Sequence, residues 1–315
     1  MNLIWACLLL AGGLLILWKC AELLVAGAVG LAQLLGVSPL IIGLTVVAMG
    51  TSAPEVAASI AAAVRGAGDV AIGNVYGSNI ANLALVGGLS ALIHPIRVQL
   101  RTLRREIPVM LVVALLLWPV LRNLSLSRLE GVGLLAVFSA LILLTVCTAR
   151  KDTAKVKQKP RYEIRDTKRN VLFVVIGLVG LALGADMAVR GAVFVGERIG
   201  LSQAIIGLTI IAVGTSLPEL ATCLVAAVKG QHDISIGNLV GSNIFNTLLV
   251  VGTAGVVRPF TIVQRLAGVD YWIMIVVSAA FASVVIIGRR IIGRTAGAML
   301  LCGYVAYMVY LLAYS

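Results

Sequence analysis

The sequence predicts an all-α membrane protein with ten transmembrane helices in two inverted five-helix repeats. Two observations support this class: an extreme apolar composition and an internal duplication. Of the 315 residues, 60% are hydrophobic and 12% charged, and the mean hydropathy of +1.07 lies far above that of water-soluble domains. Apolar runs recur along the chain, each near the roughly 20 residues that a helix needs to cross about 30 Å of hydrocarbon.

Ten such runs are expected to span the membrane. The first has no basic residue ahead of its apolar part and no small-residue cleavage site, so we interpret it as a retained span and not as a signal peptide. The predicted spans are residues 2–30, 38–64, 70–93, 107–121, 126–149, 170–197, 202–228, 234–257, 268–287 and 292–313.

The chain carries the same pattern twice. Residues 36–96 align with residues 200–260 without a gap, and 31 of the 61 positions are identical at an offset of 164. Five spans per half is an odd number, so the second half must enter the membrane from the opposite side. We therefore expect an N-terminal five-helix repeat at 1–149, a basic cytoplasmic linker at 150–169 and an inverted C-terminal five-helix repeat at 170–315.

Loop charges give the orientation. The stretch 149–169 has nine Lys or Arg and three acids, which predicts a cytoplasmic, flexible linker able to contact anionic lipid. If successive loops alternate between the two sides of the membrane, 17 of the 25 basic residues lie inside and six outside. Both termini are then expected to be extracytoplasmic, in a multi-pass protein of the cell (inner) membrane. Topology thus explains the net charge of +12, and no nucleic-acid-binding motif accompanies it.

Acidic residues inside spans are costly and indicate function. Four are expected well inside, in two repeat-related pairs: Glu22 with Asp186, and Glu55 with Glu219. Glu22 follows Lys19 by three residues and Asp186 precedes Arg190 by four, which favours local ion pairs with a structural role. Glu55 and Glu219 have no such partner, so another positive group must balance them.

Each unpaired glutamate lies in a polar motif, "GTSAPE" (50–55) or "GTSLPE" (214–219). Pro54 and Pro218 are expected to break or kink the helix, which is tolerated at this depth where backbone lines a site. The next spans carry "GSNIAN" and "GSNIFN", which place a Ser and an Asn on one helix face in each copy. These hard oxygen donors favour Ca²⁺ or Na⁺ over zinc or copper.

With these motifs the sequence resembles the cation/calcium antiporter superfamily, in particular prokaryotic sodium/calcium exchangers. The resemblance implies four ion positions in a mid-membrane diamond, bridged by the two glutamates, and a first and sixth helix that slide across the other eight. It implies these donors: the carbonyl oxygens of Ala48 and Ala212, and the side chains of Thr51, Ser52, Glu55, Ser78, Asn82, Thr215, Ser216, Glu219, Ser242 and Asn246.

The sequence departs from the family pattern in two places. Some relatives, including potassium-dependent ones, have Asp where this chain has Asn246, so potassium dependence is less expected. The linker is also too short for the regulatory calcium-binding domains of animal exchangers.

Charge balance predicts antiport. Two ionised glutamates are neutralised by one Ca²⁺ or about two Na⁺, so the loaded site can cross a low-dielectric barrier. The empty site carries two unpaired charges, and the same barrier penalises its crossing. The expected function is Ca²⁺/Na⁺ exchange, with H⁺ as the alternative coupling ion and Mg²⁺ or Mn²⁺ as alternative divalent ions. A passive channel fits paired mid-membrane acids less well. No cofactor, ATP site or enzymatic motif is expected, and His94 and His232 lie near span ends.

Overall fold

The computed structural model describes residues 2–155, 164–201, 206, 210 and 212–314. Residues 156–163 of the predicted linker, and most of residues 202–211 at the start of a predicted span, lie outside the described residues. Helices dominate the described part of the chain, as expected for an all-α membrane protein.

The first half begins with one long helix, and several of its later helices are interrupted by π-helical turns, written η. Its elements are α1 (Leu3–Leu35), α2 (Pro39–Ile42), η1 (Gly43–Val47), α3 (Ala48–Thr51), α4 (Ala53–Val64), α5 (Gly68–Ile80), η2 (Ala81–Val86), α6 (Gly87–Ile93), β1 (Ile96–Arg97), η3 (Thr102–Glu106), α7 (Ile107–Leu121), β2 (Ser125–Leu126) and α8 (Arg128–Lys155).

The second half repeats this order. Its elements are α9 (Ile164–Arg198), α11 (Ala212–Thr215), α12 (Leu217–Val228), α13 (His232–Phe245), η5 (Asn246–Val250), α14 (Val251–Val257), β3 (Phe260–Thr261), η6 (Leu266–Asp270), α15 (Tyr271–Ile287), β4 (Ile291–Ile292) and α16 (Arg294–Tyr314).

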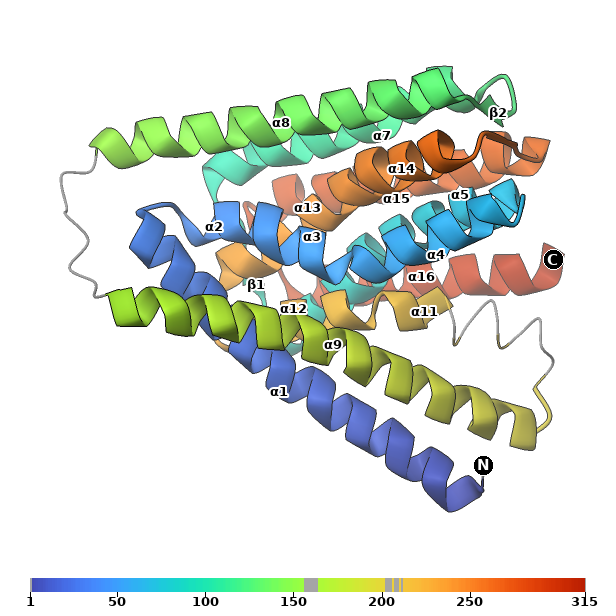
Figure 1. Cartoon of the computed structure of the whole chain (residues 1–315), viewed down its shortest axis with the longest axis horizontal. Coiled ribbons are helices and arrows are strands. Elements are labelled where there is room, and N and C mark those ends of the chain that lie inside the picture. Colours follow the sequence, from blue (N-terminus) through green and yellow to red (C-terminus); the bar gives the residue numbers. More distant parts are fainter. Residues whose placement is uncertain (1, 156–163, 202–205, 207–209, 211, 315) are drawn as a thin grey trace.

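Helices α1 and α9, the first of each half, pack along each other at one side of the bundle (Figure 1). Their close approach depends on glycine. A Cβ added at Gly13 of α1 would lie 2.6 Å from the Ala188 nitrogen, and one at Gly184 of α9 would lie 3.0 Å from the Gly13 oxygen. The helices run antiparallel, since residues late in α9 face residues early in α1.

Two short ribbons join the halves. Strand β1 pairs with β4 and strand β2 with β3, both antiparallel, so each ribbon takes one strand from each half. An aspartate lies beside each ribbon: Asp69 accepts a hydrogen bond from the Val263 backbone N–H at 2.7 Å, and Asp233 accepts one from Gln99 Nε2 at 2.6 Å. These two aspartates are themselves 164 positions apart, so the duplication extends to the contacts between halves.

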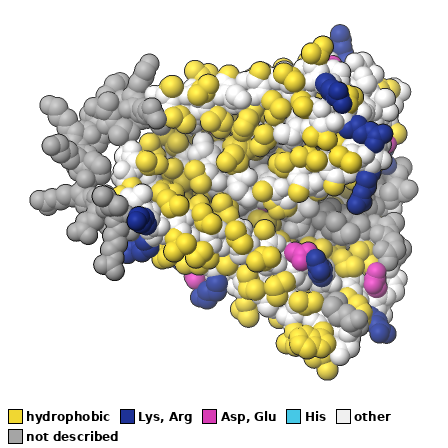
Figure 2. All heavy atoms as spheres, in the orientation of Figure 1, with side chains coloured by type: hydrophobic (Ala, Val, Ile, Leu, Met, Phe, Trp, Pro, Cys, Tyr) yellow, Lys and Arg dark blue, Asp and Glu magenta, His cyan; other side chains and the backbone are white. Residues whose placement is uncertain are grey.

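The outer surface suits a membrane. Figure 2 shows hydrophobic side chains over the middle of one face, with Lys and Arg mainly toward its two ends. By length and composition, seven helices of the described residues could cross a bilayer, or eight if the bent pair Pro39–Thr51 and Ala53–Val64 is one span. The chain is therefore a multi-pass, mostly helical membrane protein.

The acids at the first helices of each half are paired as predicted. Lys19 Nζ lies 3.1 Å from Glu22 Oε2, and Arg190 Nε lies 2.8 Å from Asp186 Oδ2. Both acids lie within long helices that could cross a membrane, Leu3–Leu35 and Thr167–Arg198, and their side chains are 29% and 53% exposed. Glu22 also pairs with Lys229, at the end of α12, at 3.5 Å.

Two acids that the sequence did not single out are more enclosed. The Glu106 side chain is 12% exposed, and Asp270, 164 positions later, is 8% exposed. Each follows a repeat-related arginine and pairs with it, Arg101 at 3.9 Å and Arg265 at 3.2 Å. The predicted linker also differs from expectation, because α8 continues to Lys155 and α9 begins at Ile164, so its two ends are helical.

Candidate functional site

Both glutamate motifs lie where a helix breaks. Helix α3 ends at Thr51 and α4 begins at Ala53, with a bend of 43° between the two segments. Ser52 at the break has φ −81° and ψ 5°, and Ser216 in the second copy has φ −89° and ψ 5°. The break predicted from the proline of each motif is confirmed.

The break places each glutamate in the first turn of a new helix, α4 or α12. A helix N-terminus carries partial positive charge and unpaired N–H groups, which favour a carboxylate there. The helix N-terminus therefore supplies part of the positive charge that balances each glutamate, since neither glutamate has a basic neighbour in the sequence.

Glu55 and Glu219 are both 0% exposed and lie close enough for their charges to interact. Each is held by hydroxyl groups from both halves. Ser52 Oγ donates to Glu219 Oε1 at 3.1 Å across the two halves, and Thr215 lies in hydrogen-bond contact with Glu55 in the reciprocal direction. The carboxylates thus share one buried region although 164 positions separate them.

The helices that follow each motif supply the remaining hydroxyls. Ser78 Oγ lies 3.4 Å from Glu55 Oε1, and Ser242 Oγ lies 3.5 Å from Glu219 Oε1. One helical turn later, Asn82 lies in η2 and Asn246 begins η5. π-Helical turns are frequent at functional sites because they displace the backbone ladder by one residue.

Several buried polar atoms of this region have no hydrogen-bond partner among the described residues. These are the second carboxylate oxygens of Glu55 and Glu219, the amide atoms of Asn82 and Asn246, and the hydroxyl of Ser216. An unpaired buried polar atom costs about 1–3 kcal/mol. Their concentration around two carboxylates is consistent with a site that binds a cation through oxygen atoms.

The structure brings together most of the residues selected from the sequence. All of the following are buried, and Thr51, Ser52, Ser78 and Ser242 contact one of the two carboxylates: Thr51, Ser52, Glu55, Ser78, Asn82, Ser216, Glu219, Ser242 and Asn246. The Ala48 carbonyl accepts the Ser52 N–H at 3.0 Å, and Ala212 begins α11. Their service as ion ligands remains a prediction.

Sequence reasoning missed a second layer behind these donors. Asn74 contacts the Glu55 carbonyl and Ser59, while Asn238 contacts Thr51 and Cys223. A signal was present, because Asn74 and Asn238 are identical polar residues at the repeat offset, each four positions before a selected serine.

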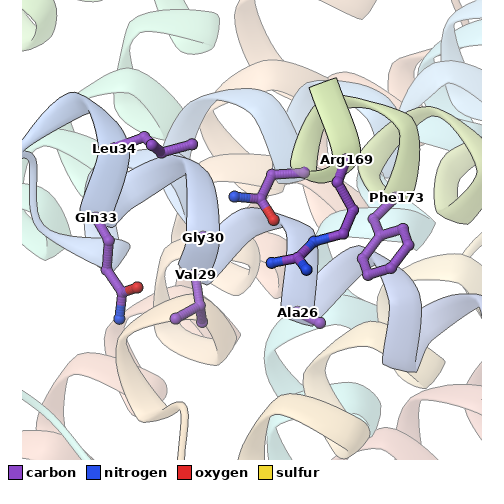
Figure 3. Close-up of a pocket in the computed structure, with 8 residues that line it drawn as sticks. Ala26, Val29, Gly30, Gln33, Leu34, Arg169 and Phe173 are labelled. Atoms are coloured by element: carbon purple, nitrogen blue, oxygen red, sulfur yellow. The ribbon is translucent and has the colours of Figure 1, made fainter. Parts of the chain in front are cut away.

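A separate pocket of about 310 Å³ lies between α1 and α9, near the start of α9 (Figure 3). Gln33 and Gly30 of α1 face Arg169 and Phe173 of α9 around it. Neither glutamate of the broken helices contributes to its lining, so it is distinct from the buried carboxylate region.

Comparison with known proteins bears on this geometry. A family model described as sodium/calcium exchanger protein matches residues 5–147 and 169–313. CaxA of Alkalimonas amylolytica, named as a candidate antiporter, is 39% identical over 305 residues, covering 95% of each chain. The sodium/calcium exchanger MaX1 of Methanosarcina acetivorans is 33% identical over 342 residues, covering 96% of this chain and 97% of the relative.

Solved structures agree. A structure of the sodium-calcium exchanger NCX_Mj, soaked with Na⁺ and Sr²⁺, superposes with a TM-score of 0.85 at 28% identity, covering 98% of this chain and 99% of that chain. The match to the family model extends over both halves of the molecule, including both broken helices. The chain therefore belongs to the sodium/calcium exchanger protein family.

Proposed function

We propose that this protein exchanges Ca²⁺ for Na⁺ across the cell membrane, by alternating access to the buried region around Glu55 and Glu219. The family and its solved relative support cation/Ca²⁺ antiport. The observation that carries the proposal is the convergence of two fully buried carboxylates, one from each half: Ser52, three residues before Glu55, donates a hydrogen bond to Glu219.

The donors around these carboxylates support a hard cation as substrate. Hydroxyl, amide and carboxylate oxygens predominate, which suits Ca²⁺ and Na⁺. The ten side chains selected from the sequence are proposed as ligands, and the Ala48 and Ala212 carbonyls complete the set of twelve. Transported ions bind as substrates, and no catalytic step or cofactor is proposed.

Ten spans in two inverted repeats are proposed as the frame of this site. The antiparallel packing of α1 on α9 and the two inter-half ribbons support an axis of pseudo-symmetry between repeats 1–149 and 170–315. In this arrangement α7 and the broken helix that ends in α12 are spans too, although α7 has only 15 residues and α12 only 12. Both termini would then face outside, with the linker 150–169 inside.

Proton-coupled exchange is the second candidate. The observation that favours it is the proximity of two buried carboxylates, which can share a proton when the cation leaves. Reconstituted protein separates the two candidates. We expect uptake of radioactive Ca²⁺ into proteoliposomes to follow an imposed Na⁺ gradient and to persist when the pH gradient is collapsed. Uptake that follows pH and ignores Na⁺ would replace sodium by protons as the coupling ion.

Replacing either carboxylate tests the site. Glu55→Gln or Glu219→Gln removes half of the site charge at nearly constant shape, so we expect Ca²⁺ exchange to fall at least 100-fold while the protein still folds. The flux assay gives the rate, and size-exclusion profiles in detergent report folding. Glu22→Gln changes an ion pair outside the buried carboxylate region, so its effect on exchange should be milder than that of either site variant. Normal exchange by either site variant would contradict the proposal.

A further inference from the structure

We propose that Asn238 is a positioning residue that takes the hydroxyl proton of Thr51 and so turns the Thr51 oxygen lone pairs toward the transported cation. This inference rests on the proposed function, because it assumes that Thr51 binds the cation. Asn238 itself would make no contact with the ion.

The contact runs between the halves. Thr51 Oγ1 in α3 lies 3.0 Å from Asn238 Oδ1 in α13, and Thr51 and Asn238 are 1% and 0% exposed. A hydroxyl has one proton and two lone pairs, so it can offer lone pairs to a cation only if its proton points elsewhere. The Asn238 carbonyl oxygen is a buried acceptor at the required distance.

The Asn238 amide is oriented by a chain of hydrogen bonds behind it. Its Nδ2 donates to Cys223 Sγ at 3.3 Å. The Cys223 thiol donates to the Ser235 carbonyl at 3.5 Å, so its sulfur is left to accept. The Ser235 hydroxyl in turn donates to the Cys223 carbonyl at 3.1 Å. With Nδ2 committed to the sulfur, Oδ1 must face Thr51.

Thr51 also has two competing acceptors. Its hydroxyl oxygen lies 3.4 Å from the Ala48 carbonyl oxygen, farther than the 3.0 Å to Asn238 Oδ1. Its hydroxyl also lies in hydrogen-bond contact with the Glu219 carboxylate. A proton donated to Glu219 would point into the space between hydroxyl and carboxylate, where a cation would be held, and would repel it. Donation to Asn238 removes this conflict, as residues behind metal ligands commonly do for the ligands in front of them.

The first half repeats the hydrogen-bond chain behind the amide, with a different acceptor for the amide nitrogen. Asn74 Nδ2 donates to Ser59 Oγ at 2.9 Å, and the Ser59 hydroxyl donates to the Ala71 carbonyl at 3.3 Å. Ser59 and Cys223 occupy equivalent positions, so a hydroxyl in one copy does what a thiol does in the other. The direction of both chains is conserved between the copies, which supports a role in orienting the amide.

The test compares Asn238→Leu with wild type in the proteoliposome assay. Leucine has a similar size but cannot accept the Thr51 proton. We expect the KM for Ca²⁺ to rise about tenfold, with a smaller change in maximal rate. Cys223→Ser is the matched control: it gives the second half the acceptor found in the first, so its KM should stay within about twofold of wild type.

A double-mutant cycle with Thr51→Val separates positioning from a general structural role. If Asn238 acts through Thr51, Asn238→Leu should have little further effect once the hydroxyl is gone. The cycle is also read from Ca²⁺-dependent thermal stabilisation in detergent, which requires no transport. Full additivity, or an unchanged KM in Asn238→Leu, would overturn the inference. Absence of exchange in the wild type would instead refute the proposed function.

Discussion

Single residues of one half complete the site of the other. Ser52 donates to Glu219, Thr51 donates to Asn238, and Thr215 contacts Glu55, so each glutamate depends on hydroxyls from the opposite repeat. The sequence predicts which residues matter, since polar positions retained at an offset of 164 stand out against variable apolar neighbours. It does not predict these partners, because the pairing across halves depends on the packing of helices that are distant in the chain.

The two serines at the helix breaks give a matched pair of substitutions. Ser52→Ala removes a hydrogen bond to a buried carboxylate and should destabilise the ion-free protein by about 1.5–3 kcal/mol. Ser216→Ala removes a buried hydroxyl that has no partner among the described residues, so it should be near neutral. Thermal unfolding in detergent without Ca²⁺ or Na⁺ measures both. Equal losses in the two variants would show that the Ser52 bond adds no stability.

At the scale of helices, sequence periodicity locates segments better than it locates their irregularities. The break predicted from Pro54 is confirmed by the bend between α3 and α4. It could be predicted because proline lacks a backbone donor. The π-turns η2 and η5, which contain Asn82 and Asn246, were not predicted, since a one-residue shift of the hydrogen-bond ladder leaves no mark in composition. Glu106 and Asp270 were missed for a related reason: they lie in π-turns η3 and η6, close to span ends.

The ion pair between Glu22 and Lys229 connects α1 to the end of α12. If α1 slides against the remaining helices during exchange, this pair stabilises one access state. Lys229→Ala should therefore shift the balance between states by up to about fivefold, the effect of about 1 kcal/mol from a partly exposed pair. We expect the KM for Ca²⁺ to change in opposite directions in right-side-out and inside-out vesicles.

The control for this prediction is Arg190→Ala, which breaks an ion pair confined to one helix and should leave both KM values unchanged. Parallel changes on the two sides of the membrane in Lys229→Ala would indicate an effect on the site itself, and would contradict a role in the access equilibrium.

For the whole molecule, duplication and loop charge predict the topology. Figure 1 shows both ends of the chain at one side of the bundle, and the end of α8 with the start of α9 at the other. An odd number of crossings in each half requires this arrangement. The number of spans is harder to read, because α7 and α12 are short and the helices with the buried glutamates are broken.

Cysteine labelling tests the orientation. Asn123→Cys lies beside β2 and Arg289→Cys beside β4, at opposite ends of the proposed frame. In a background without the native cysteines, a membrane-impermeant maleimide should label the first in intact cells and the second only after permeabilisation. The reverse pattern would invert the proposed topology, and labelling of both from one side would refute the odd number of crossings between them.

The ribbons that join β1 to β4 and β2 to β3 make the repeats interdependent for folding as well as for ion binding. A chain severed in the linker could still reassemble, since each fragment would find its complement. Either fragment by itself would expose unpaired strand edges and bury a glutamate lacking its partner hydroxyl. We therefore expect neither half to fold stably without the other, although the sequence retains the pattern of two copies.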